Sequence, residues 1–171
     1  MQKEFKMPYC TGHGVPGAMV SVVCNNAMNR AVREFQLTQP DEILNKTREL
    51  VVETFEKSDA DVYDGMDIAL CALNLETLAL SFAGANNGLY FIRNNELNEI
   101  KPDKQPIGKY DNAKPFTAHQ LQLQKGDVIY TFSDGFPDQF GGAKGKKFMY
   151  KPFKRMLIEI HKKPMDEQHK I

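Results

Sequence analysis

The sequence predicts an α+β protein in which helices and antiparallel strands form separate layers. Two helical patterns come first, a series of strand-like segments with short turns follows, and one more helical pattern lies near the carboxyl end. This order favours antiparallel sheets over the regular strand–helix alternation of parallel-sheet proteins. A chain of 171 residues with 42% apolar residues suits one compact domain, so we expect a single domain over residues 1–171.

Two amphipathic helices are predicted in the first third of the chain. The first covers residues 17–35, and Pro16 suits its start. Its apolar residues recur at spacings of three and four, and they are Val20, Val23, Ala27, Ala31, Val32 and Phe35. The second helix begins in the segment TQPDE, where Thr38 can act as a cap and Pro40 suits the first turn. Its buried stripe is predicted to contain Ile43, Thr47, Leu50, Val51, Thr54 and Phe55.

After Gly65 the apolar pattern becomes typical of strands. Segments 68–75 and 78–83 predict a hairpin with Glu76 and Thr77 between its two strands. LYFIR and ELNEI predict a second hairpin, because the turn formers Asn94 and Asn95 separate them. Both hairpins indicate an antiparallel sheet.

The remaining segments complete the predicted fold. Residues 102–115 are rich in proline and are expected to form a long ordered loop. FTAHQLQLQ alternates like a half-buried strand, and VIYTF at residues 128–132 is apolar enough to predict a buried central strand. The last helix is predicted from an apolar stripe, which consists of Phe153, Met156, Leu157 and Ile160.

Composition argues against several classes of protein. Lys and Arg total 22, as do Asp and Glu, so the chain lacks the overall basic charge typical of nucleic-acid-binding proteins. The three cysteines have no metal-ligand spacing, and their odd number suits reduced thiols. No apolar run approaches the roughly 20 residues of a membrane span, and the amino end has no signal-peptide pattern. We therefore expect a cytoplasmic protein without nucleic-acid or membrane partners.

A glycine-rich loop at residues 9–18, YCTGHGVPGA, places Gly12, Gly14 and Gly17 in a G-x-G-x-x-G array. A dinucleotide-binding loop of this pattern needs a buried parallel strand directly before it. The preceding segment MQKEFKMPYC is charged and contains proline, so it makes a poor central parallel strand. Dinucleotide binding is therefore disfavoured. A tight bend with close helix packing, or another phosphate chemistry, remains open.

Three stretches together resemble the metal-dependent protein phosphatases of the PPM superfamily, in particular the bacterial stage II sporulation and sigma-factor regulatory group. They are CTGHGVPGAMVS at residues 10–21, DGMDIALCALN at 64–74 and YTFSDGFPDQFGG at 130–142. AGANNGLYFIR and KQPIG lie between them in the order expected for that group. The resemblance implies an α-β-β-α sandwich of antiparallel sheets flanked by helices.

The resemblance also implies hydrolysis of phosphoserine or phosphothreonine at two Mn²⁺ or Mg²⁺ ions held by aspartates. Carboxylates suit these hard cations, which prefer oxygen ligands and acidify bound water. Asp134, after the apolar strand VIYTF, is the leading metal-ligand candidate, and Asp67 is an accessory one. His13 is a candidate proton donor or phosphate ligand. Other residues expected in the site loops are Gly12, Gly14, Ser133, Gly135 and Asp138. Asp138 is expected mainly to hydrogen-bond to the backbone of its own loop.

For each single residue a structural role is the alternative. Asp134 could be an ordinary turn aspartate, and His13 could face solvent or bond to backbone. The phosphate-site interpretation depends on the ordered set of motifs.

The chain departs from the family pattern at its first motif. Relatives have an aspartate that bridges both metals where this chain has Tyr9. A neutral phenol with a pKa near 10 is a poor ligand for hard cations. The segments that carry further ligands at either end of the family domain are also missing, so the domain is expected to be incomplete at both ends.

Two functions of different class follow from these observations. The first is a serine/threonine phosphatase domain of a signalling protein, weak or inactive as this segment, whose phosphoprotein substrate is of the anti-sigma-factor antagonist type. The second is a phosphatase-like module that binds or scaffolds without catalysis. A small-molecule binder with residues 102–115 as a lid is a third, more distant reading. Unpaired strand edges left by the missing segments would favour self-association.

Overall fold

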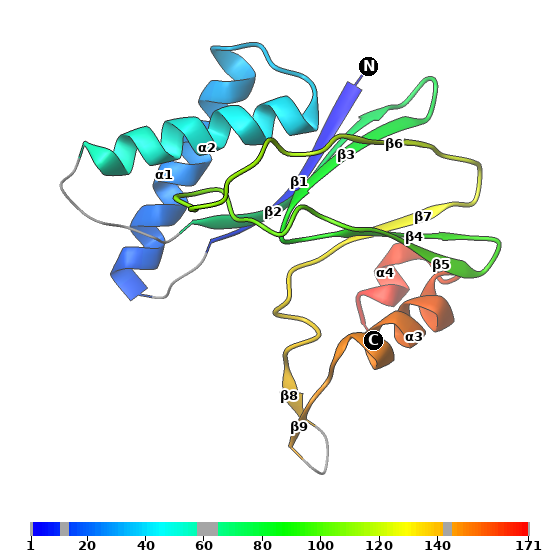
Figure 1. Ribbon diagram of the computed structural model, residues 1–171. Coiled ribbons are helices and arrows are strands. Elements are labelled where there is room, and N and C mark those ends of the chain that lie inside the picture. Colours follow the sequence, from blue (N-terminus) through cyan, green and yellow to red (C-terminus); the bar gives the residue numbers. More distant parts are fainter. Residues whose placement is uncertain (1, 11–13, 58–64, 142–144, 171) are drawn as a thin grey trace.

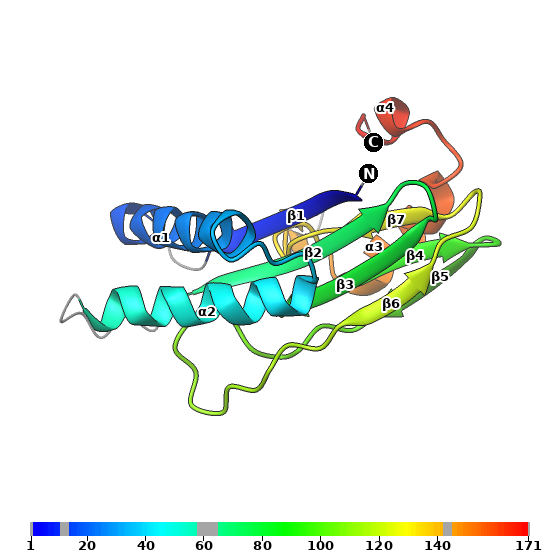
Figure 2. The ribbon, with the colours of Figure 1, turned by 90° about the horizontal axis from the view of Figure 1, so that it is seen from above.

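The computed structural model describes residues 2–10, 14–57, 65–141 and 145–170, with side chains from residue 17 onward (Figure 1). Two helices cover one sheet, a second sheet lies beneath it, and two further helices cover the far side (Figures 1 and 2). The helices are α1 (Gly14–Arg33), α2 (Pro40–Glu56), α3 (Tyr150–Ile160) and α4 (Met165–Gln168). This arrangement confirms the predicted α-β-β-α layers.

Both main sheets are antiparallel. The first has the strand order β1-β2-β3-β6, formed by β1 (Gln2–Cys10), β2 (Met66–Asn74), β3 (Ala79–Ala85) and β6 (His119–Gln122). The second has the order β5-β4-β7, formed by β4 (Leu89–Arg93), β5 (Glu96–Ile100) and β7 (Val128–Thr131). A short hairpin, β8 (Phe140–Gly141) and β9 (Lys146–Lys147), follows the second sheet.

Side-chain alternation in β2 explains why the sheets stack. Ile68 and Leu70 pack against the helices α1 and α2, whereas Ala69 and Cys71 face the second sheet. Successive side chains of a strand point to opposite faces, so a strand with apolar residues at every position is buried on both sides. A third cluster joins the outer face of β4 to α3, mainly through Tyr90 and Phe153. Three apolar layers therefore hold four structural layers together.

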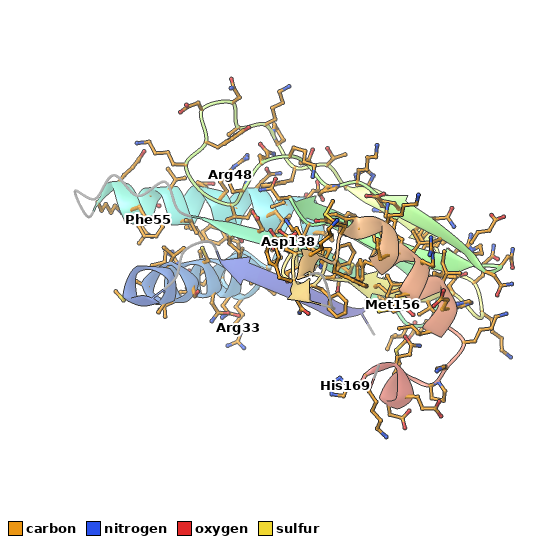
Figure 3. All side chains as sticks on the ribbon, turned by 90° about the horizontal axis from the view of Figure 1, so that it is seen from below. Arg33, Arg48, Phe55, Asp138, Met156 and His169 are labelled. Atoms are coloured by element: carbon orange, nitrogen blue, oxygen red, sulfur yellow. The ribbon has the colours of Figure 1, made fainter. Side chains whose placement is uncertain are left out.

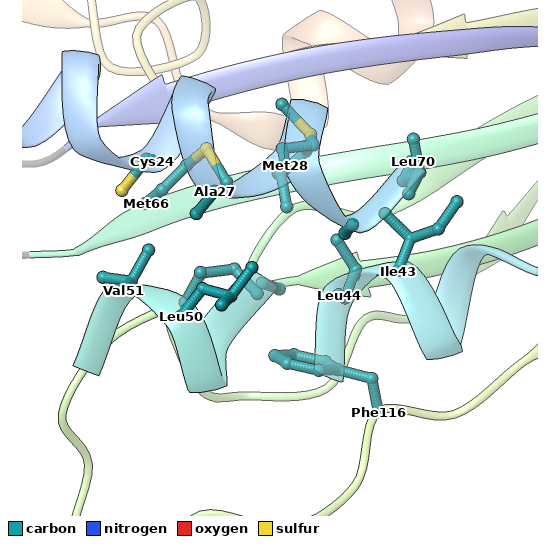
Figure 4. Packing of buried hydrophobic residues seen from close by; sticks show 14 of the residues in the cluster. Cys24, Ala27, Met28, Ile43, Leu44, Leu50, Val51, Met66, Leu70 and Phe116 are labelled. Atoms are coloured by element: carbon teal, nitrogen blue, oxygen red, sulfur yellow. The ribbon is translucent and has the colours of Figure 1, made fainter. Parts of the chain in front are cut away.

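The helical layer packs closely on the first sheet. Figure 4 shows Cys24 and Met28 of α1 and Leu44 of α2 gathered over Met66 and Leu70 of β2. The hydroxyl of Thr47, buried within the α2 stripe, donates to the Ile43 carbonyl at 2.7 Å, so its polar group is satisfied. Most residues of the predicted stripes are buried, but Phe35 is 43% exposed beyond the end of α1 at Arg33, and Thr54 is exposed.

The structure differs from the sequence predictions in several elements. The strand VIYTF is not a buried central strand: β7 is half-buried throughout and pairs only with β4 among the described residues. The first hairpin turn contains four residues instead of two, because β2 ends at Asn74 and Leu78 adopts a positive φ of 58°. The amino-terminal segment forms an antiparallel edge strand, β1, which was not predicted, and neither was α4.

The predicted ordered loop at residues 102–115 is confirmed and is tied to the body of the protein. The backbone of Ile107 exchanges two hydrogen bonds with Met66, at 2.9 and 3.0 Å. The buried Gln105 amide bonds to both the backbone N–H and the carbonyl of Lys114, at 2.9 and 2.8 Å. These contacts hold the loop beside the start of β2.

An ion pair closes the turn between β6 and β7. The Arg93 guanidinium donates to both oxygens of Asp127, at 3.0 and 2.6 Å, and the Gln124 N–H donates to the same carboxylate at 2.8 Å. The hydrogen bonds from Arg93 are the main cause that lowers the pKa of Asp127, although partial burial opposes them. The turn itself uses Gly126 at a φ of +95°.

We expect Asp127→Asn to lower the melting temperature at pH 7 by about 3 °C, because a charge-assisted contact is lost. A lowered carboxyl pKa contributes stability above the ordinary value of about 3.9 and loses it as the pH falls through the folded-state value. The difference between native and variant proteins should therefore shrink below pH 4 in thermal unfolding followed by circular dichroism. A difference that is constant from pH 7 to pH 3 would contradict this role for the ion pair.

Candidate functional site

Segments far apart in the sequence meet where β2 begins. The Cα of Tyr9, near the end of β1, lies directly opposite the Cα of Asp67 in the β1–β2 ladder. The charge of Asp134, in the loop after β7, acts on the carboxyl of Asp67. Positions 67 and 134 come from two of the three stretches that carry the family resemblance, and position 9 directly precedes the third. The fold therefore brings these stretches to one place.

Asp67 is the best-defined acidic group of this site. Its side chain is half-buried, and its Oδ1 accepts a hydrogen bond from Asn86 Nδ2 at 2.8 Å. Burial is the main cause that raises the pKa of Asp67 above its usual range, and the negative charge of Asp134 adds to it. The Asn86 hydrogen bond and the charge of Lys104 act in the opposite direction. An additional positive charge at this place would stabilise the ionised pair.

Asn86 is a site residue that the sequence analysis did not identify. It follows β3 in the segment AGANNG and has a positive φ of 56°, a conformation that asparagine tolerates better than most residues. Its N–H donates to the Asp103 carbonyl at 2.9 Å, which fixes the turn. A Cβ at Gly84 would lie 2.3 Å from the Asn87 carbonyl oxygen, so this turn requires glycine there. The two asparagines after Gly84 in the segment AGANNG were the sequence feature that could have indicated this turn.

Asp134 lies in a compact loop that directly follows β7. Its side chain is exposed, and its carbonyl accepts the Asp138 N–H at 2.9 Å. Ser133 beside it is half-buried, and a Cβ at Gly135 would lie 3.3 Å from the Ser133 hydroxyl oxygen. The loop therefore presents the Asp134 carboxylate to solvent from a folded backbone.

Asp138, labelled in Figure 3, belongs to the same loop but has a different partner. Its carboxylate pairs with Lys147 Nζ of the β8–β9 hairpin at 2.8 Å. Asp134 and Asp138 both contribute to the raised pKa of Tyr150, whose main cause is burial. Asp138 therefore connects the site loop to the hairpin.

Some predicted site residues lie outside the described residues. These are Gly12 and His13, and the side chain of Tyr9 is also outside them. Gly14 is the first residue of α1. The structure thus brings together Asp67, Asp134, Ser133 and Gly135, and leaves the glycine loop as a sequence-based prediction.

The described residues do not fit a dinuclear metal centre. Such a centre needs several carboxylates, whereas no group of three or more His, Cys, Asp or Glu side chains in the described ranges could hold a metal ion. Asp67 and Asp134 alone are too few carboxylates for such a centre. Separately, none of the helices in the described ranges is long and apolar enough to cross a membrane.

Comparisons with known proteins identify the family and the fold. The family model for stage II sporulation protein E matches residues 10–170. The SiaA-PP2C domain of Pseudomonas aeruginosa superposes with a TM-score of 0.80 at 27% identity, over 98% of this chain and 69% of that one. A comparison of the sequence with curated proteins gives no significant match.

More distant solved structures share the fold. The phosphatase domain of SpoIIE from Bacillus subtilis, with part of its regulatory domain, has a TM-score of 0.69 at 13% identity, covering 96% of this chain and 44% of that one. The RsbU and RsbW domains of a Mycobacterium tuberculosis protein have a TM-score of 0.73 at 16% identity, covering 98% and 46%. The chain thus spans less than half of these two longer chains. On the match over residues 10–170 and the shared fold, the chain belongs to the stage II sporulation protein E (SpoIIE) family of PP2C-type phosphatase domains.

Proposed function

We propose that residues 1–171 are part of a protein serine/threonine phosphatase domain that removes phosphate from a regulatory phosphoprotein. The observation that carries this proposal is the meeting of Asp67 and Asp134, from two motif-bearing stretches, beside the end of β1. Two carboxylates near strand ends, Asp67 at the start of β2 and Asp134 after β7, one half-buried and one exposed, suit a divalent cation and a phosphoryl group. The substrate would be a phosphoserine or phosphothreonine protein of the anti-sigma-factor antagonist class.

The proposed reaction is hydrolysis of a phosphate ester. The oxygen of a water molecule forms a bond to phosphorus, the bond from phosphorus to the serine oxygen breaks, and one water proton ends on that oxygen. Bound Mn²⁺ or Mg²⁺ would supply positive charge for the phosphoryl oxygens and lower the pKa of water. Asn86 holds the Asp67 carboxylate in place, and His13 is the proposed proton donor to the leaving oxygen.

The residue at position 9 limits the hydrolysis rate that we expect. A tyrosine there leaves two carboxylates where the family chemistry uses more, so cation affinity and turnover should both be low. This same observation favours the second candidate function, a phosphatase-like module that binds a phosphoprotein partner without catalysis. The first candidate predicts cation-dependent hydrolysis, and the second predicts none.

A phosphopeptide assay tests the proposal. We expect the native chain to release phosphate slowly from a phosphoserine peptide in millimolar Mn²⁺, above the rate after chelation with EDTA. The chelated sample is the control for phosphate release that needs no metal. Equal rates with and without Mn²⁺, combined with tight binding of the same peptide, would favour the non-catalytic module.

A further inference from the structure

The segment after the Asp134 loop presents an exposed surface that the proposed reaction does not use. This surface, the hairpin face, consists of Phe140, Lys146, Lys147, Met149, Lys151 and Arg155, all of which are exposed. The β8–β9 hairpin that carries it projects away from the two sheets, and α3 continues from it (Figure 1).

The hairpin face is held against the loop that carries Asp134. Besides the ion pair of Lys147 with Asp138, the Met149 N–H donates to the Pro137 carbonyl at 2.7 Å. The Phe148 N–H donates to the Gln139 carbonyl at 2.8 Å. A polypeptide bound on this face would therefore lie next to the proposed phosphate site.

Large apolar groups on this face are open to solvent. Phe140 is 77% exposed and Met149 is 54% exposed. Phe140 borders a groove of about 450 Å³, whose lining also includes Phe136, Phe148 and Met156. Exposed aromatic groups around a concave surface are typical of protein–protein contact sites, where they supply most of the binding energy.

The charge of the segment is one-sided, unlike that of the whole chain. Between Phe140 and Arg155 there is no acidic residue, although Lys and Arg balance Asp and Glu overall. Lys147 and Lys154 form ion pairs, with Asp138 and Glu99. Lys146, Lys151 and Arg155 have no ion-pair partner within the ranges that the structure describes. Clustered cations of this kind attract a partner of opposite charge.

We propose that the hairpin face docks an acidic segment of the phosphoprotein substrate, with one apolar side chain of that segment in the groove beside Phe140. The role of this segment as part of a substrate rests on the proposed function, whereas the docking itself does not require catalysis. A nucleic acid fits less well, because its affinity comes from many phosphate contacts and a broad basic surface. Here Lys146 lines an apolar groove, and Lys151 and Arg155 follow on α3.

Binding of a fluorescein-labelled, unphosphorylated peptide tests the docking without metal. The peptide contains several glutamates and one leucine, and binding is followed by fluorescence anisotropy on the full chain. We expect Phe140→Ser, and separately Lys146→Glu combined with Lys151→Glu, to weaken binding about tenfold. A peptide with lysine in place of glutamate should bind at least tenfold more weakly, and added salt should weaken binding of the acidic peptide.

Matched substitutions far from the hairpin face serve as controls. Val22→Ser removes an apolar side chain that is 66% exposed on α1, and Lys125→Glu reverses a charge in the β6–β7 turn. Both should leave peptide affinity within twofold of the native value. Equal weakening by the controls, or no weakening by the hairpin variants, would overturn the proposal.

Competition separates the other partners. Single-stranded RNA or anionic phospholipid vesicles that bind the hairpin face more tightly than the acidic peptide would overturn the proposal in favour of those partners. The outcome is independent of the phosphatase proposal. If the acidic peptide binds but no phosphopeptide is hydrolysed, docking is supported and catalysis is refuted. If phosphopeptide is hydrolysed but peptide binding does not depend on the hairpin face, catalysis is supported and docking is refuted.

Discussion

Tyr9→Asp should bind Mn²⁺ about a hundredfold more tightly than the native chain. The Cα of position 9 faces that of Asp67, and directly opposite positions in an antiparallel ladder are close enough for their side chains to share a ligand. The substitution adds a third carboxylate to Asp67 and Asp134. Cation affinity rises with the number of charged oxygen ligands. Isothermal titration calorimetry with Mn²⁺ measures the change directly, and phosphoserine-peptide hydrolysis should rise with it.

Neutral replacements at the same position provide the control for Tyr9→Asp. Tyr9→Phe removes only the hydroxyl, and Tyr9→Asn supplies a side chain of aspartate size without its charge. Both should leave Mn²⁺ affinity within a few fold of the native value. An equal gain in Tyr9→Asn would mean that space, and not the carboxylate, limits cation binding, which contradicts the prediction.

Asp134→Asn, introduced together with Tyr9→Asp, should remove most of the Mn²⁺ affinity gained by Tyr9→Asp. It should also lower phosphopeptide hydrolysis at least about a hundredfold, as is typical when a charge-stabilising group is lost. Asp134 is exposed and its charge acts on Asp67, so its removal should cost affinity without disturbing the core. Circular dichroism should show an unchanged melting temperature within about 2 °C, because surface substitutions change stability little.

Asp111→Asn is the matched control for Asp134→Asn. Asp111 is an exposed aspartate in the long loop at residues 102–115, and the same atoms change. Its variant should keep the Mn²⁺ affinity and hydrolysis of the Tyr9→Asp protein. Retained hydrolysis after loss of Asp134 would remove this aspartate from the site and, with it, the main argument for a phosphatase.

The elements that could be predicted from the sequence are those with strong local patterns. The stripe of α2, with Ile43, Leu50 and Val51, repeats at the helical period and is buried as expected. The hairpin of β4 and β5 turns at Asn94 and Asn95, which have positive φ values of 53° and 64°. Both patterns depend on neighbours within a few residues, so they can be read from the chain alone.

The misassigned strands depend on distant parts of the chain. β7 is apolar, but its burial depends on what lies beside it in the sheet, and only β4 does so among the described residues. β1 carries Lys3, Glu4 and Lys6, which look unsuited to a strand. Such charges are common on the edge of an antiparallel sheet, which is where β1 lies.

The site residues also divide into those that lie in sequence motifs and those that depend on distant parts of the chain. Asp134 and Asp67 stand in motifs, so the resemblance pointed to both, and the structure brings their charges together. Asn86 could not be assigned because its partner Asp67 lies nineteen positions earlier in the chain. The pairing of Asp138 with Lys147 depends on the hairpin fold between them, which no local pattern indicates.

Paramagnetic broadening by Mn²⁺ tests most directly whether positions 9, 67 and 134 form one cation site. Amide signals of isotopically labelled Tyr9→Asp protein are recorded while Mn²⁺ is added below the protein concentration. Signals near residues 9, 67, 86 and 134 should disappear together and first, while those of Asp111 and of α4 remain. Early loss confined to one of these segments, or early loss elsewhere in the protein, would contradict a shared site.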